Sequence, residues 1–85
     1  MNNLERSAHY GELQKLVDEV YAVNPSHSGA RIDIITRAEI NDLNDDLMEV
    51  ITLLPGGSYH RSQLCDHINS ILAAHGWSFV YGTVE

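Results

Sequence analysis

The sequence predicts a small α+β domain of three helices and a two-stranded antiparallel sheet, in the order α-β-α-α-β. Apolar side chains recur at spacings of three and four in three segments, which is the pattern of helices with one buried face. Two other segments alternate apolar with polar residues and are rich in β-branched or aromatic side chains, as strands are. A chain of 85 residues can bury one modest core, so residues 1–85 are expected to form a single domain.

The first helix is expected over residues 4–22. It must end before Pro25, because proline disfavours the helical conformation of the residue that precedes it. A loop of turn-forming residues follows, and residues 31–36 (RIDIIT) then predict the first strand. In this strand Ile32 and Ile34 alternate with charged residues, so one face would be apolar.

The central predicted helix spans residues 36–54 (TRAEINDLNDDLMEVITLL). Thr36 and Glu39 have the spacing of a capping box at its start, and Pro55 ends it. Its apolar side chains fall within an arc of about 100° and are expected to face the core. They are Ile40, Leu43, Leu47, Val50, Ile51 and Leu54. Among them, Leu47 and Val50 should be almost fully buried.

A third helix is expected over residues 59–75, capped by Ser58 at its start and ended by Gly76 in a left-handed conformation. Residues 77–84 (WSFVYGTV) predict the second strand, whose aromatic side chains point to one face. We expect this strand to pair with residues 31–36, and the helices to cover one face of the sheet and bury the aromatic side chains. The aromatic residues are Trp77, Phe79 and Tyr81.

Charge restricts the classes of partner. Five basic residues against twelve acidic ones give a net charge of −7 at pH 7. DNA-binding proteins draw affinity from clustered Lys and Arg, whereas here the basic residues stand singly along the sequence. The field of the protein repels a polyanion, so we expect a basic protein surface as partner and no direct nucleic acid. The basic residues are Arg6, Lys15, Arg31, Arg37 and Arg61.

The compartment is predicted from what the sequence lacks. Its single cysteine cannot form an internal disulfide. It has no apolar run of the ~18 residues that a membrane span requires, and its first residues have no signal-peptide pattern. We therefore expect a cytoplasmic protein without a membrane partner.

Acidic side chains occupy the helix face beside the apolar one in residues 36–54. Glu39 and the four candidate binding residues, Asp42, Asp45, Asp46 and Glu49, fall within an arc of about 120°. On one continuous helix about 27 Å long, carboxylates would recur every ~5–6 Å, which is close to the phosphate spacing of one DNA strand. Small acidic proteins of phages and other mobile genetic elements often occupy the basic DNA-binding surface of a nucleic-acid-handling protein in this way, and this chain is comparable to them in charge and size. The sequence thus favours a non-enzymatic binding module that inhibits or regulates a protein of that class.

Several chemistries have little support in the sequence. His60 and His67 share a helix face but would lie about 10 Å apart along the axis, too far for one metal ion, and the compact spacings of zinc sites are absent. Cys65 and His67 are two residues apart and point in divergent directions on a helix. We therefore expect no catalytic residue, no metal and no cofactor.

Two alternatives remain open. The order α-β-α-α-β is also that of a winged helix that lacks half of its wing, with residues 59–75 as the recognition helix. That alternative is a small transcriptional regulator, although Arg61 would be the only permanent cation exposed on that helix. The other alternative is a housekeeping interaction or dimerisation domain. The oligomeric state is expected to be a monomer or a homodimer.

Overall fold

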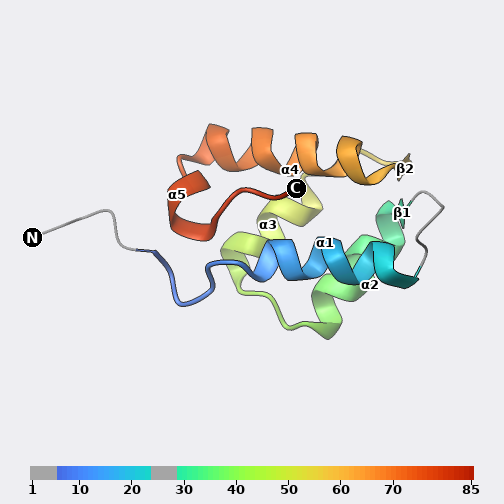
Figure 1. The fold of residues 1–85 in the computed structure, drawn as a ribbon, viewed down its shortest axis with the longest axis horizontal. Coiled ribbons are helices and arrows are strands. Elements are labelled where there is room, and N and C mark those ends of the chain that lie inside the picture. Colours follow the sequence, from blue (N-terminus) through green and yellow to red (C-terminus); the bar gives the residue numbers. More distant parts are fainter. Residues whose placement is uncertain (1–5, 24–28) are drawn as a thin grey trace, which may run out of the picture.

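The computed structural model describes residues 6–23 and 29–85, and in these ranges it has five helices and one two-stranded antiparallel sheet (Figure 1). The α+β class that the sequence predicted is confirmed. The elements, in order, are α1 (Glu12–Val23), β1 (Gly29–Ala30), α2 (Arg31–Ile40), α3 (Asp45–Thr52), β2 (Ser58–Tyr59), α4 (Arg61–His75) and α5 (Ser78–Tyr81).

The first helix begins at Glu12, later than expected, because residues 8–11 form a turn in which Gly11 has a φ of 89°. The start of the expected helix and most of the loop after it, residues 1–5 and 24–28, lie outside the described residues.

The sheet is built from other residues than those predicted. β1 and β2 pair Gly29 with Tyr59 and Ala30 with Ser58, so the expected pairing of residues 31–36 with 77–84 is wrong. Each strand has only two residues, which is too short to leave an alternating pattern in the sequence. The sheet therefore links the first and second halves of the chain through backbone hydrogen bonds, and it does not form a layer that the helices cover.

Residues 31–36, predicted as a strand, belong to helix α2. Ile34 and Ala38 are fully buried and stand four residues apart, which is a helical spacing. The hydroxyl of Thr36 donates a hydrogen bond to the carbonyl oxygen of Ile32 at 2.7 Å, inside the helix. The predicted capping box of Thr36 is therefore wrong, because the helix begins five residues earlier, at Arg31.

The predicted helix 36–54 is interrupted between α2 and α3. Asp42 has a φ of 54°, in the left-handed region that ends helices. Asn44 then begins α3, since its side-chain oxygen accepts a hydrogen bond from the amide of Leu47 at 2.9 Å. The interruption rotates Ile40 out of the core, whereas the remaining apolar positions of the prediction are buried. These are Leu43, Leu47, Val50, Ile51 and Leu54.

Helix α4 agrees with the third predicted helix within two residues at its start. Its N-terminus is closed by the amide of His60, which donates to the side chain of Gln63 at 2.9 Å, and Ser58 lies in β2 instead of capping the helix. Gly76 has a φ of 72° and ends the helix as predicted. The amide of Trp77 donates to the carbonyl of Leu72 at 2.8 Å, which completes the left-handed stop.

The predicted strand 77–84 is instead the short helix α5 followed by an extended segment, residues 82–85. Of its aromatic side chains, Tyr81 is buried as expected, Trp77 is half-buried, and Phe79 is 49% exposed. The alternation of Trp77, Phe79 and Tyr81 therefore did not mark a strand face.

The core lies between the four longer helices. α1 packs against α2 and α4, and α3 packs against the same two helices from the other side. Leu47 and Val50 of α3 are fully buried, as predicted. Beyond α5 the chain turns back, and residues 82–85 run between α1 and α4 (Figure 1). In the described ranges no helix combines the length and the apolar character that crossing a membrane requires.

Candidate functional site

The four predicted binding residues do not share one helix, because Asp42 precedes α3, whereas Asp45, Asp46 and Glu49 belong to it. Asp42 is in the turn and Asp45 is the first residue of α3, and both are exposed. Because α3 has only eight residues, it does not provide the long, regular row of carboxylates that resembled a DNA strand. That part of the prediction was based on a continuous helix and is wrong.

Asp46 and Glu49 point toward the C-terminal part of the chain. The phenol of Tyr81 donates a hydrogen bond to Oδ2 of Asp46 at 2.7 Å, and this contact, together with burial, raises the pKa of Tyr81. Oε2 of Glu49 lies 3.5 Å from Nε2 of His75, whose ring stacks on Trp77 with 4.3 Å between the ring centroids. These two carboxylates therefore contribute to the fold as well as to the surface charge.

Asp42 and Asp45 remain as freely exposed carboxylates. Their side chains make no hydrogen bond or ion pair with another residue of the described ranges. We call these two residues the acidic corner. A pocket of about 220 Å³ adjoins it, lined by His9, Glu12, Lys15, Asn41, Asp42 and Leu43.

Two isoleucines on α2 are the most exposed large apolar side chains of the described residues: Ile32 is 66% exposed and Ile40 is 64% exposed. They are eight residues apart, so they stand about 80° apart around the helix and about 12 Å apart along it. Thr36, also exposed, lies between them. We call Ile32, Thr36 and Ile40 the α2 ridge. Ile40 is two residues from Asp42, so the ridge and the acidic corner are within about 8 Å of each other.

Most of the basic side chains are held in contacts within the chain. Arg31 donates to the carbonyl oxygens of Thr52 and Leu54, both at 2.8 Å, and so satisfies the C-terminal end of α3. The guanidinium of Arg6 lies over the ring of Tyr10, 4.3 Å from its centroid. These cations are positioned by the fold, and they do not form a patch that could bind phosphate groups.

The order α1, β1, α2, α3, β2 repeats the α-β-α-α-β order that suggested a winged helix. In this order α3, not residues 59–75, would take the place of the recognition helix. The residues of α3 include Asp45, Asp46 and Glu49 and no Lys or Arg. A helix of this charge is unsuited to enter a DNA groove between phosphates.

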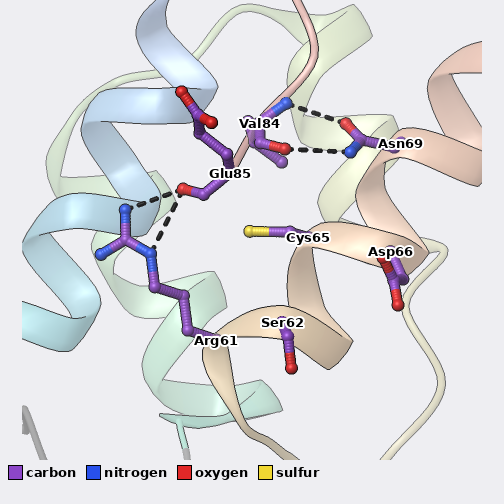
Figure 2. A pocket seen from close by; sticks show the side chains of 7 residues that line it. All are labelled: Arg61, Ser62, Cys65, Asp66, Asn69, Val84 and Glu85. Atoms are coloured by element: carbon purple, nitrogen blue, oxygen red, sulfur yellow. Dashed lines mark hydrogen bonds between the residues drawn. The ribbon is translucent and has the colours of Figure 1, made fainter.

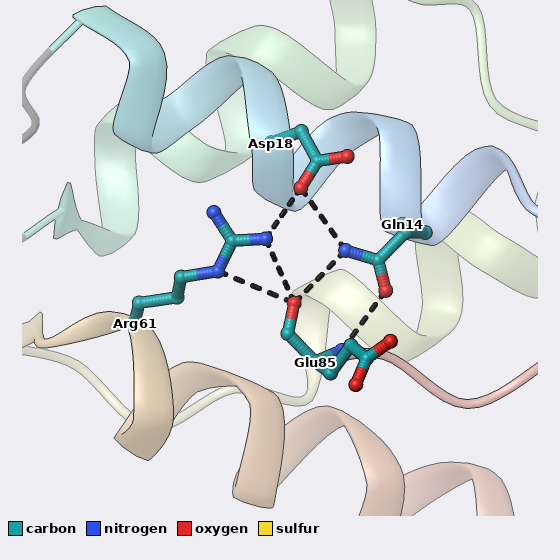
Figure 3. A network of polar contacts seen from close by, with 4 residues as sticks. All are labelled: Gln14, Asp18, Arg61 and Glu85. Atoms are coloured by element: carbon teal, nitrogen blue, oxygen red, sulfur yellow. Dashed lines mark hydrogen bonds and ion pairs between the residues drawn. The ribbon is translucent and has the colours of Figure 1, made fainter.

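A second site, which the sequence did not reveal, holds the end of the described chain. Val84 gives and accepts hydrogen bonds with one side chain: its amide donates to Oδ1 of Asn69 at 2.8 Å, and its carbonyl accepts from Nδ2 at 2.9 Å (Figure 2). Glu85 does the same with Gln14, with both distances 2.9 Å (Figure 3). Asn69 belongs to α4 and Gln14 to α1, so the segment is bound on both sides.

Arg61 completes this contact. Its Nε and one terminal nitrogen donate to the carbonyl oxygen of Glu85 at 3.2 and 2.8 Å, and the same nitrogen binds Asp18 of α1 (Figure 3). The hydrogen bond from Arg61 and a second one from Gln14 lower the pKa of Asp18. α1, α4 and the terminal segment thus meet in one polar network.

A pocket of about 490 Å³ lies beside the bound segment (Figure 2). It is lined by Arg61, Ser62, Cys65, Asp66, Asn69, Val84 and Glu85. Cys65 is the free thiol of the chain, and its burial raises its pKa, which disfavours the reactive thiolate at neutral pH. The side chain of Val84 is 5% exposed and belongs to the core.

Among the residues that the structure describes, no group of three or more His, Cys, Asp or Glu side chains is placed to hold a metal ion.

No model of a protein family, no curated protein and no solved structure matches the chain significantly.

Proposed function

We propose that this chain is a non-enzymatic protein-binding module that docks a basic partner through the α2 ridge and the acidic corner. The observation that carries the proposal is the exposure of Ile32 and Ile40 on one helix beside Asp42 and Asp45. Ile32 and Ile40 are more exposed than the other large apolar side chains of the described residues and lie on one helix, and an apolar surface bordered by polar residues is a candidate interaction surface.

The two parts of the surface have different roles in binding. Full burial of an exposed isoleucine contributes about 1.5–3 kcal/mol, and Ile32 and Ile40, which are 66% and 64% exposed, would each contribute part of that on association. The carboxylates of Asp42 and Asp45 would steer a basic partner toward the ridge and fix its orientation. Glu39, exposed in the last turn of α2, adds a further negative charge beside Ile40.

The partner class that we propose is a nucleic-acid-handling protein, which this chain would inhibit or regulate. Such proteins carry the basic surfaces that bind phosphates, and those surfaces attract a domain with a net charge of −7. Direct reading of DNA is not proposed, because α3 presents carboxylates where a recognition helix needs cations.

The test is quantitative capture of proteins from an extract of the cell that makes this chain, with matched variants. Ile32→Ser with Ile40→Ser should reduce retention of the specific partner at least about tenfold, which corresponds to about 1.4 kcal/mol. Asp42→Asn with Asp45→Asn should weaken retention at low salt and make the remaining affinity less dependent on salt.

The control variants carry the same kinds of change elsewhere. Leu53 is 52% exposed near the end of α3, and Asp66 is exposed on α4, so Leu53→Ser and Asp66→Asn should retain the partner like the unmodified protein. Equal retention by the ridge variant and by Leu53→Ser, with unchanged circular dichroism, would contradict the proposal.

A further inference from the structure

We infer that the space between α1 and α4 is a groove for an extended peptide segment of a partner protein, and that residues 83–85 occupy it as an internal ligand. The inference is based on Gln14, Arg61 and Asn69 and on the pocket beside them. It shares no residue with the α2 ridge or the acidic corner and does not depend on the function proposed above.

The hydrogen bonds of the bound segment alternate between the two helices. The amide and carbonyl of Val84 both face Asn69 of α4, and those of Glu85 both face Gln14 of α1 (Figures 2 and 3). A β-strand between two neighbours shows the same alternation, since successive residues direct their backbone groups to opposite edges. Two side-chain amides therefore replace the two neighbouring strands of a sheet.

An amide side chain that both donates to a backbone carbonyl and accepts from the amide of the same residue recognises the backbone itself. Such recognition does not depend on the side chains of the bound segment, so a segment of another protein can make the same bonds. Arg61 adds two further donors to the carbonyl of Glu85. Selectivity would come from the buried position of Val84, which fits a small β-branched side chain.

The internal ligand is held mainly by exposed or half-buried polar contacts. In residues 83–85 only Val84 is buried, and the hydrogen bonds of Glu85 are exposed. Segments with few buried apolar contacts detach from the rest of the fold at a small free-energy cost. Gly82, with a φ of 85° and ψ of 144°, links this segment to α5, and rotation at this glycine would let the segment leave while Tyr81 stays buried.

The pocket of about 490 Å³ beside Val84 provides room that residues 83–85 leave unfilled. Ser62, Cys65 and Asp66 of α4 line the pocket together with Arg61 (Figure 2). The partner segment that fits is therefore extended, places Val, Ile or Thr where Val84 lies, and has a larger side chain nearby to fill the pocket.

The test uses the full chain and a fluorescent peptide of residues 81–85, Tyr-Gly-Thr-Val-Glu, blocked at both ends. The variant Val84→Asp should release the internal segment, because an unpaired carboxylate is not tolerated in the buried position. The peptide should then bind this variant about tenfold more tightly than the unmodified protein, where the internal segment competes. Methylation of the valine amide of the peptide, which removes the hydrogen bond to Asn69, should weaken binding about tenfold.

Two controls make the result specific to the groove. In the Val84→Asp background, Asn69→Leu should abolish peptide binding, whereas Ser62→Ala, on the wall of the same pocket, should leave it unchanged. If a folded Val84→Asp variant fails to bind the peptide, or binds the methylated peptide equally well, the inference is wrong.

A second measurement applies if Val84→Asp does not fold. In the unmodified protein, excess peptide should shift the side-chain amide resonances of Gln14 and Asn69 in NMR spectra, and the methylated peptide should not. Unchanged resonances at millimolar peptide would overturn the inference.

Discussion

The phenol of Tyr81 donates a hydrogen bond to the carboxylate of Asp46 at 2.7 Å and so joins α5 to the first turn of α3. The position of Asp46 near the N-terminus of α3 is itself favourable, because the helix dipole stabilises negative charge there. The rings of Tyr81 and Trp77 also meet nearly at right angles, with 5.7 Å between their centroids. A residue that the sequence suggested for partner binding is thus one of the contacts that hold the C-terminal part in place.

Tyr81→Phe should lower the free energy of unfolding by about 1 kcal/mol, since it removes one partly buried hydrogen bond and little apolar surface. The pH dependence has a defined sign. The contact with Asp46 raises the pKa of Tyr81 in the folded protein, so its contribution is complete below the ordinary pKa of tyrosine, about 10, and is lost as pH rises through the raised value. Urea unfolding at pH 7, 9 and 11 measures both effects.

The matched control for this change is Tyr10→Phe, since Tyr10 is 41% exposed. Its unfolding free energy should stay within about 0.5 kcal/mol of that of the unmodified protein. If Tyr81→Phe loses stability between pH 9 and 11 as steeply as the unmodified protein, Tyr81 does not contribute to the alkaline transition. Tyr21, whose pKa is raised by burial, would then be the group to examine.

The turn between α2 and α3 gives a second prediction. Asn44→Ala should destabilise the protein by about 1 kcal/mol, because it removes the hydrogen bond that closes the N-terminus of α3. Asp42→Gly should have a small effect, since glycine adopts a positive φ without strain, whereas Asp42→Val should be clearly destabilising. Thermal unfolding of the three variants would show this order.

The capping box that the sequence predicted at Thr36 and Glu39, and that the structure lacks, provides a control for Asn44→Ala. Glu39 is exposed within α2, so Glu39→Ala should change stability by less than about 0.5 kcal/mol. A loss near 1 kcal/mol for Glu39→Ala, together with none for Asn44→Ala, would indicate one continuous helix over residues 36–54 and contradict the turn.

Helices α1 and α4 and the buried face of α3 were predictable because their signals are local, whereas residues 31–36 and 78–81 were predicted as strands and belong to helices α2 and α5. Gly76 ends α4 as the sequence indicated, and the buried positions Leu47 and Val50 follow from the helical spacing. The turn at residues 41–44 also has a local signal, two asparagines and an aspartate in four residues, but the apolar spacing continues almost undisturbed across it. Ile32 and Ile34 alternate like a strand over too few residues to be distinguished from a helix, and burial of Ile34 with Ala38 decided the outcome.

The candidate sites were less predictable. The exposure of Ile40 results from the turn after it, and no property of the residue itself indicates that it faces solvent. The groove joins Gln14 to Glu85, 71 residues apart, through backbone atoms of Val84 and Glu85. Backbone groups are the same in every sequence, so no pattern of residue types could have revealed their partners.

The core of α3 gives a third prediction. Leu47→Ala should lower the free energy of unfolding by about 2–5 kcal/mol, because Leu47 is fully buried and its truncation removes apolar contacts and leaves a cavity. Leu53→Ala makes the same change at a side chain that is 52% exposed, and it should cost less than about 1 kcal/mol. Similar losses for both variants in urea unfolding would show that α3 is turned differently from the structure described.

The thiol of Cys65 gives the last prediction, since it reports on residues 83–85 without any added ligand. Cys65 is 5% exposed and lines the pocket beside Val84, and burial raises its pKa. Alkylation by iodoacetamide at pH 8 should therefore be slow in the unmodified protein, because both access and the thiolate fraction are low. Val84→Asp should accelerate the alkylation at least about tenfold, since release of the segment uncovers the sulfur and returns the pKa of the thiol toward its ordinary value.

Thr83→Asp changes an exposed neighbour in the same segment and should leave the alkylation rate nearly unchanged. Equal rates for the unmodified protein and Val84→Asp, with both folded by circular dichroism, would mean that the segment does not cover Cys65.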